Sequence, residues 1–186
     1  MKNFNTYIDT PAAAFWRQLC LEEGTLRHYE RGDYFFREGE VAKYLGMIQS
    51  GTLKYTAYSD DGTEYILGLE FAGGFVSDFP FSFRGIKART SVIATSPCDI
   101  LCLSVSGIRS RIADDPELLN AMLESTEAVF STVYDRYKDL YTKSPQQRYS
   151  ELISTHPDIF SLFSLRDIAS FLRITPTHLS RLRHKV

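Results

Sequence analysis

Basic and hydroxyl side chains gather at the end of the chain, in the stretch TPTHLSRLRHKV (residues 175 to 186). An arginine guanidinium can donate two parallel hydrogen bonds to the edge of a guanine, and a threonine can contact a base edge, a methyl group or a phosphate. Arg181 is the leading candidate for reading a base. Arg183 and Lys185 are expected to contact phosphates, where a cation acts whatever the base sequence. The candidate DNA-contacting residues are Thr175, Pro176, Thr177, His178, Arg181, Arg183 and Lys185.

The charge of the chain is distributed unevenly. Residues 164 to 186 hold five Lys or Arg and one Asp, a net charge of +4. The whole chain carries -2, so the preceding 163 residues carry -6. A positive end on an otherwise acidic protein is typical of a local nucleic-acid contact rather than of a generally basic binder.

Start signals predict two short helices joined by a tight turn at this end. Ser164 with Asp167 three residues later is a capping-box pattern, and Thr175 followed by Pro176 is a second helix start. Such a pair is typical of a helix-turn-helix; the alternative is a helical hairpin with a solvated basic face. Arg173 stands where this turn commonly has glycine, so a positive φ there would cost strain. The apolar positions that would bury the crossing are Ile168, Leu172, Ile174, Leu179 and Leu182.

Residues 116 to 143 predict one long helix with an apolar stripe. Apolar or long side chains recur there at steps of three and four, which places them on one face. The simplest partner for such a stripe is the same helix of a second subunit, so we expect a homodimer. The alternative is that the stripe packs on the β-rich part of its own chain. The residues expected at the dimer interface are Leu119, Met122, Val129, Val133, Tyr137 and Leu140.

The first half of the chain predicts strands. Between Leu26 and Leu103, short runs rich in aromatic and β-branched residues are separated by turn signals such as ERGD, SDDG and FAGG. Many short strands at this spacing indicate a sandwich, barrel or jelly roll, here after an opening helix at residues 12–23. The predicted fold class is therefore α+β. The predicted domains are a β-roll (1–115), a long dimerisation helix (116–143) and a helix-turn-helix domain (144–186).

Composition excludes several classes of protein. With 186 residues, 44% of them apolar, the chain can bury a sizeable core. Because no run of about 18 apolar residues occurs and the N-terminus lacks the apolar core of a signal peptide, we expect no membrane partner and a cytoplasmic location. Cys20, Cys98 and Cys102 are expected to be small buried core residues, with no disulfide and no metal site.

The sequence does not favour an enzyme. A cupin-like β-barrel enzyme is the alternative from that class, and it would hold a metal with two or three histidines and a carboxylate. Of the four histidines only His28 lies in the β-rich half. The motifs GxSxG, HExxH and GxxxxGK[ST] are also absent. We therefore expect no catalytic activity, and these residues identify no cofactor.

Taken in order, the elements resemble the family of the cyclic-AMP receptor protein and the fumarate-nitrate regulator. The resemblance is carried by ERGDYFFREGE and IQSGTLKYTAYSDDGTEYILGLEFAGGFV in the β-rich half, and by SPQQRYSELISTHP and RDIASFLRITPTHLSRLRHKV at the end. The last stretch is most similar to the compact members of the family found in Bacteroidetes. The resemblance implies a double-stranded β-helix of the cyclic-nucleotide-binding type, a long dimerisation helix and a C-terminal helix-turn-helix.

In that family a ligand sits inside the β-roll, beneath the long helix. Cyclic-nucleotide binders use a Gly-Glu pair, whose Glu holds the ribose 2'-hydroxyl, and an Arg followed by a small residue, which holds the cyclic phosphate. The matching stretch here has Ser77-Asp78 in place of Gly-Glu, and Arg89-Thr90 one position late. A one-residue slip on a strand would point Arg89 to the opposite face. The candidate effector-pocket residues are Phe75, Val76, Ser77, Asp78, Arg89, Thr90, Val133 and Tyr134.

The effector is not identified by these residues. Phe79, Phe81 and Phe83 make the loop more apolar than a phosphate cradle needs, so cyclic AMP is not the expected ligand. An unknown small effector and no effector at all both stay open. An iron-sulfur sensor would need a cysteine cluster, and only Cys20 lies near the N-terminus. A haem sensor would need an axial ligand, and His28 is expected to cap a strand or face solvent instead.

These observations favour a homodimeric, sequence-specific transcription regulator that binds double-stranded DNA at a pseudo-palindromic operator. RNA polymerase is a further partner that activation would require. The alternative is a ligand-sensing or protein-binding module of the same fold that has lost DNA binding. The operator, the target genes, the choice between activation and repression, and the effect of Arg173 on DNA binding are left open.

Overall fold

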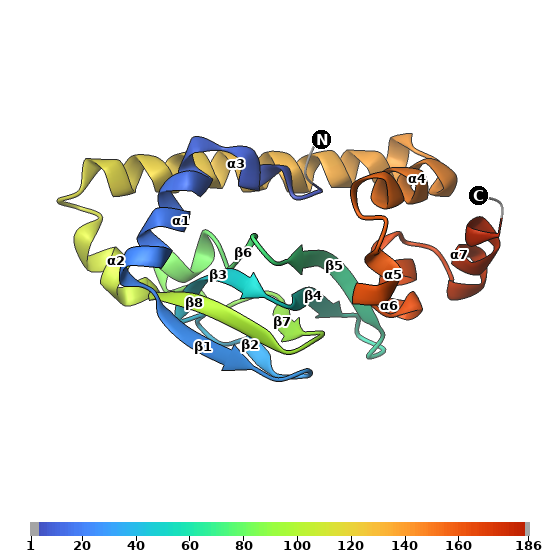
Figure 1. The fold of residues 1–186 in the computed structure, drawn as a ribbon, viewed down its shortest axis with the longest axis horizontal. Coiled ribbons are helices and arrows are strands. Elements are labelled where there is room, and N and C mark those ends of the chain that lie inside the picture. The colour runs from blue at the N-terminus through green and yellow to red at the C-terminus, as the bar shows by residue number, and fades with distance from the viewer. Residues whose placement is uncertain (1–3, 185–186) are drawn as a thin grey trace.

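Eight strands form two facing antiparallel sheets in the computed structural model, which describes residues 4–184. One sheet has the strand order β1-β8-β3-β6 and the other β2-β7-β4-β5 (Figure 1). The strands are β1 (Thr25–Tyr29), β2 (Tyr34–Phe36), β3 (Tyr44–Ser50), β4 (Thr52–Tyr58), β5 (Glu64–Phe71), β6 (Phe75–Val76), β7 (Ser91–Ala94) and β8 (Cys98–Ser104).

The two sheets close on a buried apolar core. Side chains such as Ile48, Leu53, Val92 and Ile100 are fully buried between them, because strand alternation sends every second residue inward. The sharp β3–β4 connection needs glycine. Gly51 has φ +88°, and a Cβ there would lie 2.3 Å from the carbonyl oxygen of Pro97.

Helices occupy the two ends and one side of this sandwich. They are η1 (Thr6–Asp9), α1 (Pro11–Glu23), η2 (Phe81–Arg84), α2 (Val105–Arg111), α3 (Pro116–Thr142), α4 (Pro145–Thr155), α5 (Ile159–Leu162), α6 (Leu165–Phe171) and α7 (Pro176–Arg183). Side-chain caps set several of their starts, including a complete capping box at Ser144 and Gln147. Figure 1 shows α3 running the length of the molecule above the sheets, with α1 beneath its first half.

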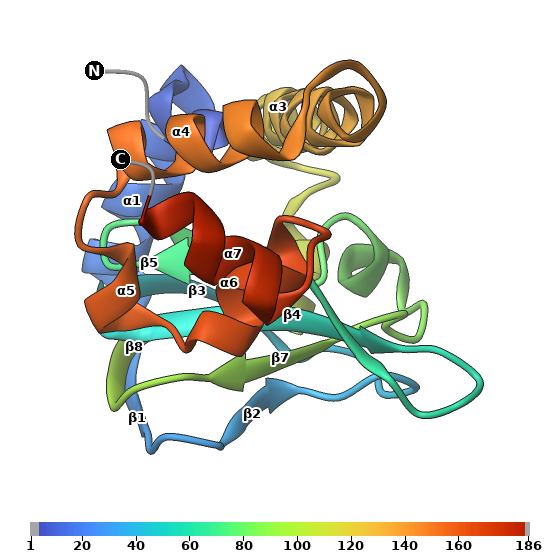
Figure 2. The same cartoon turned by 90° about the vertical axis from the view of Figure 1, so that its right-hand side faces the viewer.

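The C-terminal helices share an apolar cluster with strand β5. Ile66 and Leu69 of β5 are buried together with Ile168 and Leu179 of the last two helices. Figure 2 looks at the molecule from this end, with α6 behind α7 and next to the sandwich. The helix-turn-helix is therefore packed against the β-rich part rather than tethered beside it.

The predicted fold class is confirmed, and several element boundaries are close to prediction. The opening helix covers Pro11–Glu23 against the predicted 12–23, and the long helix Pro116–Thr142 against 116–143. Cys20, Cys98 and Cys102 are buried free thiols, as expected. The division into domains 1–115, 116–143 and 144–186 stays a prediction.

Candidate functional site

The last two described helices have the local structure that their capping residues predict. The Ser164 hydroxyl accepts from the Asp167 N–H at 3.1 Å, and the Thr175 hydroxyl accepts from the His178 N–H at 3.1 Å. Between the helices Arg173 has φ +55°, the sole positive φ of a residue other than glycine within 4–184. An L-residue pays about 1–2 kcal/mol for that conformation. The predicted strain is thus present.

The outer face of α7 is exposed to solvent. Leu179 and Leu182 are buried against the other helices, so the opposite side of α7 faces solvent. Of the predicted DNA-contacting residues, those within the described part of the chain are all exposed: Thr175, Pro176, Thr177, His178, Arg181 and Arg183. Lys185 lies outside the described residues. The Arg183 guanidinium also lies over the Phe160 ring, 4.1 Å from its centroid.

Three polar or aromatic contacts hold α6 and the turn after it against strands β4 and β5. Lys54 Nζ on β4 donates to Asp167 Oδ1 at 2.8 Å. The backbone N–H of Ile66 donates to the Ser170 hydroxyl at 3.0 Å, and the Arg173 guanidinium lies 4.8 Å from the centroid of the Tyr65 ring. The position of the helix-turn-helix is therefore tied to the β4–β5 hairpin.

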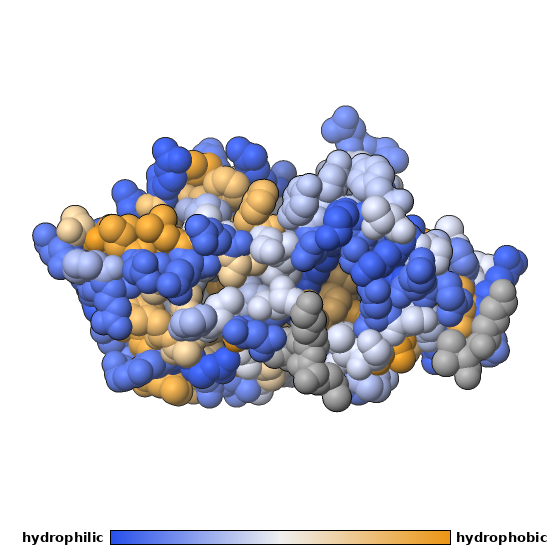
Figure 3. Space-filling model, turned by 90° about the horizontal axis from the view of Figure 1, so that it is seen from above, coloured by the Kyte–Doolittle hydropathy of each residue, from blue (hydrophilic) through white to orange (hydrophobic). Residues whose placement is uncertain are grey.

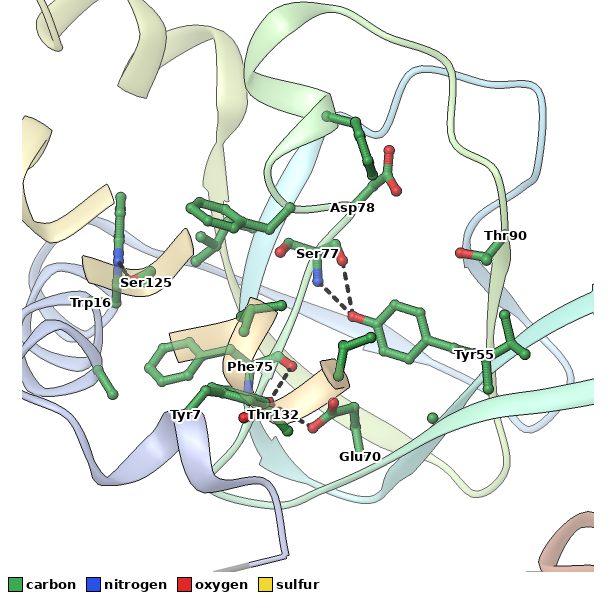
Figure 4. A pocket seen from close by; sticks show the side chains of 18 of the residues that line it. Tyr7, Trp16, Tyr55, Glu70, Phe75, Ser77, Asp78, Thr90, Ser125 and Thr132 are labelled. Atoms are coloured by element: carbon green, nitrogen blue, oxygen red, sulfur yellow. Dashed lines mark hydrogen bonds between the residues drawn. The ribbon is translucent and has the colours of Figure 1, made fainter. Parts of the chain in front are cut away.

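A cavity of about 380 Å³ lies between the β-roll and α3. Its wall is mostly aromatic and aliphatic, with a few polar groups at separate places (Figure 4). Figure 4 shows Trp16 and Ser125 at one end, Tyr7, Glu70 and Thr132 at another, and Asp78 near Thr90 at a third. The predicted pocket residues that line it are Phe75, Ser77, Asp78, Arg89, Thr90 and Val133.

A buried hydrogen-bond network closes one end of the cavity. Glu70 Oε2 accepts from the Tyr7 hydroxyl at 2.7 Å and from Asn5 Nδ2 at 2.6 Å. Arg136 of α3 donates to the Asn5 side-chain oxygen and to the Phe4 carbonyl oxygen. Burial raises the pKa of Glu70 to about 8, although these hydrogen bonds and the Arg136 charge pull it down. The network joins the N-terminal segment, β5 and α3.

Asp78 stands at a different point of the wall and lacks such partners. The residue is 7% exposed, and its Oδ2, which is closed to solvent, has no hydrogen-bond partner among the described residues. Burial raises the pKa of Asp78, and the Arg89 charge lowers it. Arg89 itself is exposed, with its guanidinium 5.0 Å from the centroid of the Phe81 ring.

Two predicted pocket residues differ from expectation. Val76 is 0% exposed in the core between the sheets, because its neighbour Phe75 takes the face of β6 toward the cavity. Tyr134 is 55% exposed and stacks on Phe130 along α3, away from the cavity wall. Arg89, one of the predicted pocket residues, lines the cavity together with Asp78, although a one-residue slip on a strand would have turned it away. Arg89 precedes strand β7, which begins at Ser91, so the alternation of side chains along a strand does not determine which way Arg89 points.

Residues that sequence reasoning missed form much of the cavity. Trp16 donates from Nε1 to the Ser125 hydroxyl at 2.8 Å, and the Tyr55 hydroxyl donates to the Ser77 carbonyl oxygen at 2.9 Å. Glu70 was missed because β5 is irregular. Tyr55 pairs with Gly68 and Thr56 with Ile66, so Leu67 is an extra residue and the faces switch there. A carboxylate inside the apolar run GLEF was the available signal.

The solvent side of α3 carries a long apolar and aromatic stripe. It consists of Leu119, Leu123, Phe130, Val133, Tyr134, Tyr137, Leu140 and Tyr141, all exposed. Of the predicted dimer residues, Met122 packs on the chain's own core and Val129 lines the cavity, so these two face inward. Figure 3 looks down on this side and shows hydrophobic residues gathered toward the end where α3 begins.

Comparison with known proteins assigns the β-rich part of the chain. Residues 26–115 match the cyclic nucleotide-binding domain family. No protein with a curated description matches the chain. Within the described residues no helix combines the length and apolar character needed to cross a membrane.

Residues 26–115 and the helices after them share their fold with several solved regulator structures. FixK2 of Bradyrhizobium japonicum is 17% identical over 87% of this chain and 83% of its own, with a TM-score of 0.76. The c-di-GMP-responsive global regulator CLP of Xanthomonas campestris is 19% identical over 92% of this chain and 90% of its own, with a TM-score of 0.69.

A third structure carries the family name. A protein of Eubacterium rectale, assigned to the Crp/Fnr family of transcriptional regulators, is 18% identical over 96% of this chain and 84% of its own, with a TM-score of 0.72. The resemblance to the cyclic-AMP receptor and fumarate-nitrate regulators is confirmed by the domain family and by the fold. The narrower likeness to Bacteroidetes members stays a prediction.

Proposed function

We propose that this protein is a homodimeric, sequence-specific DNA-binding transcription regulator with a β-roll sensor. The observation that carries the proposal is the outer face of α7, which presents Arg181 with Thr177 and His178 to solvent on a capped helix-turn-helix. A helix with this exposure can enter the major groove, where arginine reads guanine by paired hydrogen bonds. The regulators with this fold support the same assignment.

Dimerisation would follow from the outer stripe of α3. Phe130 is 67% exposed and Tyr134 55% exposed, and a stripe of this length costs free energy if it stays in water. A second copy of α3 offers the same stripe, and two-fold symmetry makes one patch cover the other. The two recognition helices of such a dimer would meet half-sites about one helical turn apart.

The β-roll would act as the sensor because its cavity borders both α3 and the β4–β5 hairpin. Val129 and Thr132 of α3 line the cavity, and α3 carries the proposed dimer stripe on its outer side, with Val133 at the edge that belongs to both. The β4–β5 hairpin holds α6 through Lys54 and Asp167. A ligand would shift the balance between two arrangements only by binding one of them better.

The DNA-binding role is tested by one substitution on the duplex that the protein selects from a random library. Arg181→Ala should weaken binding to that duplex by about 1–3 kcal/mol and relax the base preference at one position of each half-site. Arg84→Ala, which removes an exposed arginine of η2 far along the chain, is the matched control and should leave affinity unchanged. Equal affinity of wild type and Arg181→Ala would remove Arg181 from the reading role and favour a module that has lost DNA binding.

A further inference from the structure

Residues 4–7 contact three parts of the molecule that lie far apart in sequence. Asn5 and Tyr7 bond to strands β5 and β6, Thr6 bonds to α3, and Phe4 packs on the helices that follow α3. We call residues 4–7 the N-terminal strap. The strap therefore lies at the junction of the β-roll, the long helix and the helix-turn-helix.

Asn5 joins a buried acid of β5 to a base of α3. Its Nδ2 donates to Glu70 Oε2 at 2.6 Å, and its Oδ1 accepts from the Arg136 guanidinium. Asn5 itself is 4% exposed. An amide can bond to both groups because it has donors at one end and an acceptor at the other. Nδ2 also donates to the Leu69 carbonyl oxygen at 3.1 Å, so one side chain is bonded to β5 and α3 at once.

Two hydroxyl groups add to this attachment. Thr6 Oγ1 lies 2.8 Å from Thr132 Oγ1 on α3. The Tyr7 hydroxyl donates to Glu70 Oε2 at 2.7 Å and accepts from the Phe75 N–H at 3.2 Å. Figure 4 shows Tyr7, Glu70 and Thr132 together at one end of the cavity. The strap is thus anchored to the β-roll on one side and to α3 on the other.

Phe4 extends the strap to the C-terminal helices. The centroid of its ring lies 5.3 Å from that of Phe171 on α6 and 5.5 Å from that of His156, at the end of α4. The Phe71 ring of β5 lies 5.9 Å away. The Arg136 guanidinium lies 4.4 Å from the centroid of the Phe4 ring and 5.6 Å from that of Phe171. Phe4 and Arg136 together therefore connect α6 to α3.

The other contacts of α6 and its turn reach a different element. Lys54, Tyr65 and Ile66, which hold them, all belong to the β4–β5 hairpin. These contacts fix the helix-turn-helix against the sandwich, whereas the contacts of Phe4 fix it against α3. In the proposed dimer the two α3 helices pair across the two-fold axis. The separation of the two α7 helices then depends on how each α6 is held relative to its own α3.

We propose that Phe4 is a positioning residue for DNA recognition: it holds the helix-turn-helix at a fixed orientation to α3, so that both recognition helices of the dimer reach their half-sites together. This inference rests on the proposed function. When two linked modules are held at the spacing of their targets, binding of the first raises the effective concentration of the second. Without the Phe4 ring each helix-turn-helix keeps its own apolar core, but its orientation is no longer fixed.

Two duplexes separate positioning from folding. One is the symmetric duplex that the protein selects from a random library, and the other has one of its half-sites scrambled. Phe4→Ala should weaken binding to the symmetric duplex by at least about tenfold, and should change binding to the single half-site less than about twofold. Equal losses on the two duplexes would mean that Phe4 supports the fold of the helix-turn-helix instead. Either that result or an unchanged affinity for the symmetric duplex would overturn the proposal.

Tyr34→Ala is the matched control. Tyr34 is a half-buried aromatic residue with the Arg37 guanidinium 3.5 Å from its ring centroid, so its surroundings are similar to those of Phe4. It lies on β2, at the edge of the sheet opposite to β5. The ratio of the two affinities should equal that of wild type. Phe4→Leu keeps an apolar side chain and should give an intermediate ratio. If Phe4→Ala does not fold, a wild-type ratio in Phe4→Leu would contradict the proposal.

The orientation of the helix-turn-helix is also measured without DNA. Thr177→Cys on α7 and Glu127→Cys on α3 introduce thiols at exposed positions, whereas the native cysteines are buried, so spin labels attach to the introduced pair. Dilution with unlabelled protein leaves the distance within one chain. We expect a narrow distribution of distances that broadens when Phe4→Ala is added. Distributions of equal width would overturn the proposal.

Failure of this proposal and failure of the regulator role give different results. A wild-type protein that selects a symmetric duplex, with an affinity ratio that Phe4→Ala does not change, loses the positioning role alone. A wild-type protein that selects no duplex loses the regulator role. The distance measurement then decides by itself whether the strap holds the helix-turn-helix.

Discussion

Lys54 on β4 and Asp167 on α6 form an ion pair at 2.8 Å between residues 113 positions apart in sequence. Both side chains are largely buried, at 13% and 14% exposed. Lys54 also lies 3.3 Å from Glu64 on β5, so one ammonium serves two carboxylates. Any movement of the β4–β5 hairpin must therefore carry α6 with it or break a buried ion pair.

Loss of Lys54 should destabilise the protein. Lys54→Met leaves the Asp167 and Glu64 carboxylates together without their cation, and we expect the free energy of unfolding to fall by about 2–3 kcal/mol. Urea denaturation measures this. Lys138→Met is the control, because Lys138 pairs with Asp135 on the exposed surface of α3, where such pairs contribute less than about 1 kcal/mol. Similar midpoints for the two variants would mean that the pair does not hold α6.

Glu70 should make stability depend on pH. Burial raises the pKa of Glu70 to about 8 from an ordinary value of 4.5, so the folded state holds its proton where the unfolded state releases it. Stability is then lost as the pH rises from about 5 to about 8. Glu70→Gln cannot titrate and still accepts from Tyr7. We expect the difference in free energy of unfolding between the variant and wild type to shift in favour of the variant by at least about 1 kcal/mol from pH 5 to pH 8.

Thermal denaturation across that pH range checks the Glu70 prediction. Glu38→Gln, at an exposed position, should follow the wild-type curve throughout. Parallel curves for wild type and Glu70→Gln would show that Glu70 is ionised at both ends of the range.

A charge on the outer stripe of α3 should prevent dimerisation. Phe130→Glu places a carboxylate at the centre of the stripe, where pairing two copies would bury two like charges. Sedimentation equilibrium should give about twice the chain mass of 21.2 kDa for wild type and the chain mass for the variant. Leu21→Glu, at an exposed leucine of α1, should stay dimeric. A wild-type protein that is monomeric at micromolar concentration would contradict the role of the stripe.

Arg183 should differ from Arg181 in its effect on DNA binding. A phosphate contact adds affinity for every sequence, so Arg183→Ala should weaken specific and nonspecific binding alike and reduce the slope of log affinity against log salt by about 1. The base preference should not change. An unchanged salt slope would indicate that the Arg183 guanidinium stays on the Phe160 ring when DNA is bound.

Local signals in the sequence were sufficient to predict where several helices begin. Ser164, Thr175 and Ser144 cap helices with their own side chains, and each acts within three residues of the chain. The positive φ at Arg173 was also foreseeable, because the turn geometry requires it whatever residue stands there.

Features that depend on distant contacts could not be predicted. On α3, steps of three and four describe two neighbouring stripes, and only packing decides that Met122 faces the chain's own core while Phe130 faces solvent. The extra residue Leu67 changes which side chains of β5 face inward, and it places Glu70 in the cavity network. Asn5 and Tyr7 come from a segment with no periodic pattern at all.

The central claim is that α7 of a symmetric dimer reads DNA. Enrichment of a random duplex library by the purified protein at near-physiological salt tests it most directly. We predict a two-fold-symmetric motif whose half-sites are centred about one helical turn apart, with a guanine preference that Arg181→Ala relaxes. Binding that is strongly salt-dependent and enriches no motif would contradict sequence-specific recognition by this helix.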